Sequence, residues 1–224
     1  MHLRFWLKPR PSTLLVSGYL VFVAGVTVFE RADHDASLGL LASSPDALAH
    51  GKLWLLLTSG FVVAGPPVVQ LAAIGVFAWL LLRARGARVL LDAALAGHVG
   101  SALVAYAGVA FLLLVDPQLV HHVSSAPDYG VSCVLAGLLG AITATTWQRR
   151  RAGHRSRLEL GVPLLGIGVI AALTGLSPGL STSEHALAFG LGMLAPILGR
   201  TSSAPRGHLG RYAEAASKAS PLRM

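Results

Sequence analysis

Residues 130–147 read GVSCVLAGLLGAITATTW and are followed closely by the basic triplet Arg149-Arg150-Arg151. The run approaches the roughly 20 residues that a helix needs to cross the hydrocarbon core of a bilayer. Backbone groups in lipid must be hydrogen-bonded within their own segment, so this run is expected to be helical. The stretch therefore predicts a membrane-spanning helix whose basic end stays in the cytoplasm.

The rest of the chain has the same character. Of its 224 residues, 54% are hydrophobic and only 12% are charged, with a mean hydropathy of +0.64. These values exclude an ordinary soluble domain and predict an all-α polytopic membrane protein that forms one compact bundle. The single cysteine, Cys133, excludes an intramolecular disulfide. The net charge of +8 does not indicate nucleic-acid binding, because the basic residues lie in short gaps between apolar runs.

Six apolar runs are predicted to span the membrane, within a domain over residues 13–200. They cover Thr13–Phe29, Pro66–Leu82, Val89–Val115, Gly130–Trp147, Leu160–Leu176 and Glu184–Leu198. Residues 1–12 form a basic cytoplasmic N-terminus, and residues 201–224 have the composition of a disordered cytoplasmic tail. The apolar stretch Leu53–Ala64 is too short to cross and return. It predicts a partly inserted outer loop, which requires protein to cover its backbone.

The distribution of lysine and arginine sets the orientation. Apart from Arg31 and Lys52, all of them fall in the N-terminal segment, in the gaps after the second and fourth spans, and in the tail. With six alternating spans, these four regions share one side, so both termini are predicted to be cytoplasmic. A cleaved signal peptide is the alternative for the first span. The sequence after Phe29 offers no convincing small-x-small cleavage site, which favours a retained helix.

Two polar residues open the fourth and sixth spans on the predicted outer side. Ser132 would lie about one turn inside the fourth helix, with Asp128 as its N-cap, near backbone N–H groups that can stabilise an oxyanion. His185 opens the sixth span at a comparable depth. Ala188 and Gly192 follow it as a small-xxx-small face, which favours close packing on a partner helix. If that partner is the fourth span, His185 can act as general base for Ser132.

These residues resemble the rhomboid family of intramembrane serine proteases. In that family a Gly-x-Ser-Gly motif opens the fourth of six helices, and Gly130-Val131-Ser132 matches its first three positions. Gly140 matches a later packing glycine, and His185 matches the histidine that opens the sixth helix. The stretch Lys52–Ser59 is similar to the family's Trp-Arg-x-x-Thr-Ser segment, with leucine in the arginine position. Arg85–Leu91 is similar to the turn into the third helix.

The resemblance implies catalytic roles for Ser132 and His185, supported by Gly130 and Cys133. The chain departs from the family pattern at several positions. Cys133 replaces the second glycine of the motif, and Ala136 replaces an aromatic residue that packs on the histidine. The His-x-x-x-Asn pair of the second helix, which helps to form the oxyanion hole, aligns with valine and alanine at positions 68 and 72. Gln70 is the nearby side chain that could donate an amide.

Three functions follow as hypotheses. The first is an intramembrane serine peptidase that cleaves single-span membrane proteins near the outer leaflet. The second is a non-catalytic rhomboid-like protein that binds membrane helices and affects their stability or trafficking. A small transporter is weaker, because the chain lacks obvious inverted halves and has few intramembrane charges.

The predicted partners are the lipid bilayer and transmembrane substrates or clients, with no nucleic acid; the oligomeric state is left open. The sequence indicates no metal and no organic cofactor. His121 and His122, with Asp116 nearby, are assigned to a wet outer loop, because adjacent histidines seldom chelate one ion. Richness in Ala, Gly, Leu and Arg with scarce Lys points to the plasma membrane of a high-GC bacterium.

Overall fold

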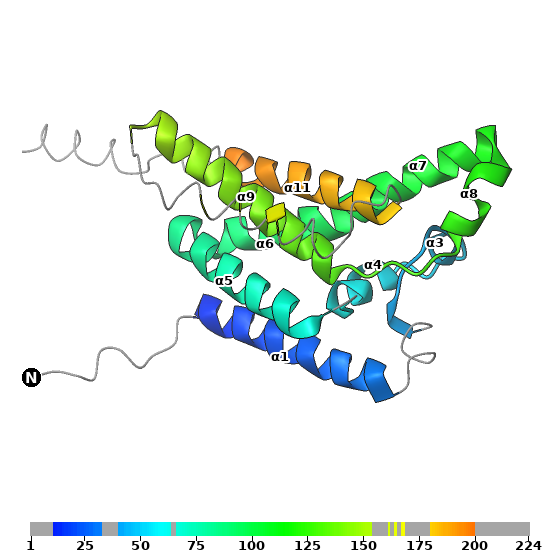
Figure 1. The fold of residues 1–224 in the computed structure, drawn as a ribbon, viewed down its shortest axis with the longest axis horizontal. Helices are drawn as coiled ribbons and strands as arrows, with labels where there is room; N and C mark the ends of the chain where they lie inside the picture. Colours follow the sequence, from blue (N-terminus) through cyan, green and yellow to red (C-terminus); the bar gives the residue numbers. More distant parts are fainter. Residues whose placement is uncertain are drawn as a thin grey trace, which may run out of the picture.

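The computed structural model describes residues 11–32, 40–63, 66–153, 161, 164, 167–168 and 180–199 (Figure 1). Apart from four single positions, the fifth predicted span lies outside the described residues, as do residues 1–10 and the tail. The described chain is helical, with one isolated antiparallel bridge between Ser43 and Asp128.

The long helices agree with the predicted spans in the described part of the chain. They are α1 (Pro11–Ala32), α5 (Pro67–Arg85), α6 (Ala87–Leu95), α7 (Ser101–Val115), α9 (Val131–Arg151) and α11 (Leu180–Leu198). A π-helical segment, η3 (Ala96–Gly100), joins α6 to α7 without a break. Short elements complete the described fold: α3 (Pro45–Ala49), α4 (Leu55–Thr58), the 3-10 helix η2 (Ser59–Phe61) and α8 (Pro117–Ser124).

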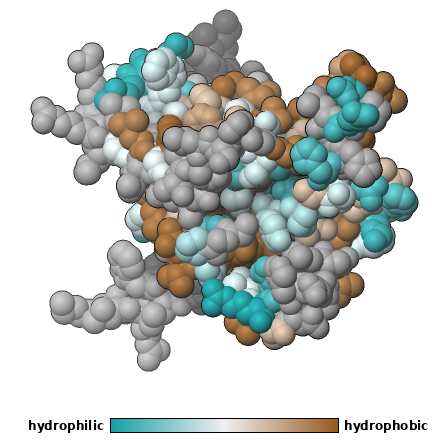
Figure 2. All heavy atoms as spheres, turned by 45° about the vertical axis from the view of Figure 1, so that its right-hand side comes forward, coloured by the Kyte–Doolittle hydropathy of each residue, from teal (hydrophilic) through white to brown (hydrophobic). Residues whose placement is uncertain are grey.

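Four helical segments in the described part are long and apolar enough to cross a membrane: Pro11–Ala32, Pro67–Arg85, Ala87–Val115 and Val131–Arg151. The membrane prediction is therefore confirmed for the first four spans. The sixth predicted span is also helical, but α11 begins at Leu180, before the predicted start at Glu184. Figure 2 shows that hydrophobic residues cover much of the described surface, as expected for side chains that face lipid.

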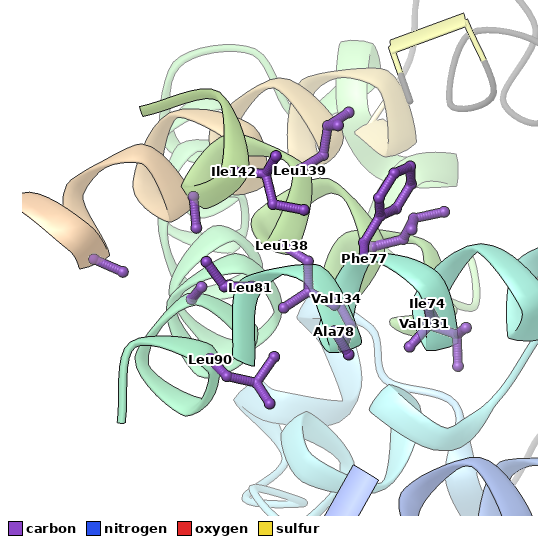
Figure 3. Close-up of a cluster of buried hydrophobic side chains, with 14 of the residues drawn as sticks. Ile74, Phe77, Ala78, Leu81, Leu90, Val131, Val134, Leu138, Leu139 and Ile142 are labelled. Atoms are coloured by element: carbon purple, nitrogen blue, oxygen red, sulfur yellow. The ribbon is translucent and has the colours of Figure 1, made fainter. Parts of the chain in front are cut away.

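Helix α9 forms the centre of the bundle. Within its most apolar window 72% of the residues are buried, against 11% for α1. Its side chains pack with those of α5 and α6 in the main hydrophobic cluster, drawn in Figure 3. The labelled residues are Ile74, Phe77, Ala78, Leu81, Leu90, Val131, Val134, Leu138, Leu139 and Ile142.

A single glycine turns the chain from α5 into α6. Gly86 has a φ of +86°, in the left-handed region that side chains disfavour, so the two helices form a tight hairpin. At this turn Arg85 donates through Nε to the Thr145 hydroxyl at 3.3 Å and through its guanidinium to Gln148. The basic ends of α5 and α9 therefore lie together.

One side of the loop before α5 is covered by protein, whereas Leu53, Trp54 and Leu57 are exposed. Leu55, Leu56 and Ser59 are buried, and the Ser59 carbonyl accepts from the Gly130 N–H at 2.9 Å. The Tyr19 hydroxyl donates to the Gly60 carbonyl at 2.8 Å. These bonds fasten the loop to α1 and to the start of α9, at the end of the bundle opposite the basic residues.

Candidate functional site

Helices α9 and α11 run side by side in the same direction (Figure 1). Cys133 and Ala136 of α9 cluster with Ala188 of α11, and one turn later Gly137 lies against Gly192. Because later residues of α9 contact later residues of α11, the two helices are parallel. Their first turns therefore lie at the same end of the bundle.

Glycines allow this close approach. A Cβ built on Gly192 would overlap the carbonyl oxygen of Gly137, and one built on Gly140 would overlap the carbonyl oxygen of Phe189. A Cβ on Gly97 of η3 would lie 2.7 Å from the Gly137 Cα. Backbones of three segments thus meet at Gly137, as small residues permit in membrane helices. The structure places Gly140, Ala188 and Gly192 in the interface between α9 and α11.

This register brings Ser132 and His185 to corresponding places. Ser132 lies four residues before Ala136, and His185 lies three residues before Ala188. Residues three or four apart share one face of a helix and are separated by about 4.5–6 Å along its axis. Since Ala136 and Ala188 belong to one buried cluster, both candidate residues lie about one turn from that cluster, towards the helix starts.

The two side chains are not hydrogen-bonded to each other among the described contacts. Ser132 is half-buried, and its hydroxyl donates to the Tyr129 carbonyl at 3.3 Å. His185 is buried, and its Nδ1 lies 3.3 Å from the Ser181 hydroxyl. Its Nε2 is buried and has no hydrogen-bond partner within the described part of the chain. An unbonded buried imidazole nitrogen beside the helix of a hydroxyl is an arrangement that can tighten when a substrate binds.

Backbone donors remain at the start of α9. The N–H groups of Gly130 and Val131 donate to the carbonyls of Ser59 and Val62, at 2.9 and 3.4 Å. The next two N–H groups, those of Ser132 and Cys133, are in the first turn and have no acceptor within the helix. They are the backbone groups of this turn that could stabilise an oxyanion.

The predicted N-cap was wrong. Gly130 precedes the first residue of α9, and no side chain caps the helix. Asp128 lies further back, where its carboxylate accepts from the Tyr106 hydroxyl at 2.8 Å and from the Ser43 hydroxyl at 3.4 Å. The backbone bridge to Ser43 and the tyrosine on α7 hold Asp128 away from the helix terminus.

Positions 68 and 72 of α5, aligned above with the family's His-x-x-x-Asn pair, face away from the protein. Val68 is 78% exposed and Ala72 is exposed. The buried positions with this spacing are Gln70 and Ile74, each 1% exposed. Figure 3 shows Ile74 close to Val131, so Gln70 lies one turn nearer the end where Ser132 lies. An alignment two residues later would have matched the inward face.

Cys133 and Ala136 have packing roles. Cys133 is 3% exposed and Ala136 is fully buried, and both belong to one buried cluster with Ala188 of α11. An aromatic residue at position 136 would hold α11 away from α9. The small side chain of Ala136 therefore allows α9 and α11 to pack closely.

The sequence analysis missed a buried polar cluster next to the candidate pair. The Ser43 hydroxyl lies 2.8 Å from the Tyr106 hydroxyl and 3.1 Å from the Ser59 hydroxyl. Glu184, only 1% exposed, lies beside Asp128, so the two carboxyl groups interact. This contact joins the first turns of α11 to the segment before α9. The acidic residue directly before His185 was the available signal, but the sequence analysis used Glu184 only as the start of the sixth span.

His98 of η3 contacts both the loop before α5 and the start of α9. Its Nε2 lies 3.4 Å from the Ser59 hydroxyl, and its ring fits between Gly60 and Gly130. A Cβ on Gly130 would overlap the ring. The first glycine of the Gly130-Val131-Ser132 motif therefore makes room for a histidine from η3.

No metal-binding group of three or more His, Cys, Asp or Glu side chains occurs in the part of the chain that the structure describes. No family model matches the chain, and no curated protein or solved structure matches it significantly.

Proposed function

We propose that this protein is an intramembrane serine peptidase of rhomboid type. The observation that carries the proposal is the place of Ser132 and His185, each about one turn ahead of the buried cluster that contains Ala136 and Ala188 on parallel helices. A hydroxyl and an imidazole at matching depth are costly to keep in a membrane protein and are the minimum equipment for acyl transfer.

In the proposed reaction the Ser132 hydroxyl rotates away from the Tyr129 carbonyl and attacks a peptide carbonyl. His185 Nε2 accepts the hydroxyl proton and then delivers it to the leaving amine, which breaks the peptide bond. Water hydrolyses the resulting ester and regenerates Ser132. The N–H groups of Ser132 and Cys133, with the Gln70 amide, would stabilise the oxyanion. Loss of one such donor typically slows a reaction by about 100- to 1000-fold.

The orientation belongs to the same proposal. The basic ends of α5 and α9 would lie in the cytoplasm, as the positive-inside rule requires, and the starts of α9 and α11 near the outer leaflet. In this arrangement the protein has six spans in the plasma membrane of a high-GC bacterium, and both termini are cytoplasmic. The substrates would be single-span proteins whose helices unwind near their outer ends.

The test is cleavage of a single-span substrate with a helix-destabilised outer end, in proteoliposomes, with products identified by mass spectrometry. Wild type and the matched control Ser125→Ala are expected to release the same product, because Ser125 is exposed in the loop before α9. Ser132→Ala and His185→Ala are expected to release none. Equal lack of product from wild type and Ser132→Ala would end the enzyme proposal.

A second candidate is a non-catalytic protein that binds membrane helices. The bond from the Ser132 hydroxyl to the Tyr129 carbonyl favours it, because this geometry serves packing and not catalysis. It predicts no labelling of Ser132 by fluorophosphonates. It also predicts that Ser132→Ala leaves co-purification of client helices unchanged, whereas the peptidase predicts accumulation of uncleaved substrate.

A further inference from the structure

An apolar cavity of about 400 Å³ opens between α1, the loop before α5, α5, α6 and α9. One face of the continuous segment α6–η3 forms much of its wall, with Leu91, Ala94 and Leu95 of α6 and His98 of η3 at the i, i+3, i+4 and i+7 positions. Residues of α1 line the opposite side of the cavity, and Val134 and Leu138 of α9 also line it. The cavity is not part of the candidate site at Ser132 and His185.

Water is a poor occupant. A buried water needs two to four polar partners. The Tyr19 hydroxyl in the wall is already bonded to the Gly60 carbonyl. The imidazole of His98 is held between Gly60 and Gly130, with Nε2 near the Ser59 hydroxyl. Its Nδ1 has no hydrogen-bond partner in the described part of the chain, but it is fully buried, so a water in the cavity does not reach it. The remaining lining side chains are hydrocarbon, including the ring of Phe61.

The cavity is continuous with the lipid-facing surface. Leu15, Leu57, Leu91 and Leu95 line it and are also exposed on the outside of the bundle. Helices α1, α5 and α9 and the α6–α7 segment are the four candidate spans, so acyl chains surround this opening. The cavity is too small to hold a transmembrane helix. A single helical turn, about 10 Å across and 5.4 Å long, already occupies roughly the volume of the cavity.

We propose that the cavity binds one acyl chain of a membrane phospholipid, which fills the space between α1 and α6. The chain enters sideways from the surrounding bilayer and packs against Ala94 and the wall of α9. It takes the place of the protein contacts that α1, the least buried of the four spans, lacks on this side. This inference does not depend on peptidase activity.

The test uses the full chain in nanodiscs that contain a phospholipid with a diazirine in the middle of one acyl chain. After illumination, adducts are mapped by proteolysis and mass spectrometry. We expect adducts to concentrate on residues 15–19 and 91–95, above the level on residues 111–115, which are also exposed to lipid. Equal labelling of all lipid-facing segments in the wild type would overturn the proposal.

Filling the cavity supplies the matched comparison. Ala94→Phe is expected to reduce adducts on residues 15–19 severalfold, although those residues are unchanged. Ala110→Phe, an equal substitution on the exposed face of α7, is expected to leave them at the wild-type level. Ala78→Leu reaches the cavity from α5 and replaces Ala94→Phe if that variant aggregates. If neither filling variant lowers the labelling of residues 15–19, the acyl chain binds elsewhere and the proposed site is refuted. Displacement of the acyl chain by an added peptide helix would also refute it.

Discussion

At the scale of single residues, two buried contacts outside the Ser132–His185 pair hold the site. Gly130 gives room to the His98 ring, and Glu184 ties the start of α11 to Asp128. Neither contact involves a group that the proposed reaction consumes. Both contacts therefore help to position Ser132 and His185. Substitutions at either contact can be tested by measuring the stability of the protein as well as its activity.

Gly130→Ala is expected to destabilise the protein, because the new Cβ overlaps the His98 ring between two glycines. Overpacking of this kind typically costs about 1–3 kcal/mol. Gly108→Ala on α7 is the control, since a Cβ there meets nothing within 4 Å. Thermal unfolding in detergent measures both, and an unchanged midpoint for Gly130→Ala would show that the ring can move aside.

Glu184→Gln and Glu184→Ala test the contact with Asp128, in which two carboxyl groups can share a hydrogen bond only when one of them holds a proton. The amide of glutamine can still donate to Asp128, so we expect near wild-type stability. Alanine removes the donor and opens a space at a residue that is 1% exposed, a loss of about 1–3 kcal/mol. Equal unfolding midpoints for the two variants would contradict a role for this bond.

At the scale of elements, the pair α9–α11 determines where the candidate residues lie. Gly192→Ala would place a Cβ on the Gly137 carbonyl oxygen and separate the helices, at a cost of about 1–3 kcal/mol. Gly190→Ala lies two residues away on the same helix and meets nothing within 4 Å. We expect substrate cleavage to fall with Gly192→Ala and to persist with Gly190→Ala. Activity retained by both would show that the spacing is not critical.

The helices were easier to predict than their faces. Continuous apolar runs fix the first four spans, because lipid leaves the backbone few alternatives. The inward face of α5 was misassigned, since nearly every residue there is apolar and hydrophobic periodicity is therefore weak; only Gln70 marks the buried side. The place of Asp128 depends on Ser43 and Tyr106, which are distant in sequence, so local capping rules could not find it.

At the scale of the whole molecule, the bundle has a basic end and an end closed by loops. The native Cys133 is buried, so introduced cysteines can report which end faces outward. We expect Ser125→Cys to react with an impermeant maleimide on intact cells. Arg88→Cys, beside the Gly86 turn, is expected to react only after permeabilisation. The reverse pattern would invert the proposed orientation and place the candidate site in the cytoplasmic leaflet.

The central position of α9 has a consequence for biogenesis. It is the least apolar of the four candidate spans and by far the most buried. For such a helix, contact with lipid is less stabilising than packing against neighbouring helices. The isolated α9 would therefore insert into the bilayer inefficiently. Its stable integration during synthesis would depend on α5 and α6, which precede it in the chain and supply its packing surface. Deletion of those two helices should leave α9 poorly inserted, as a glycosylation-site assay could detect.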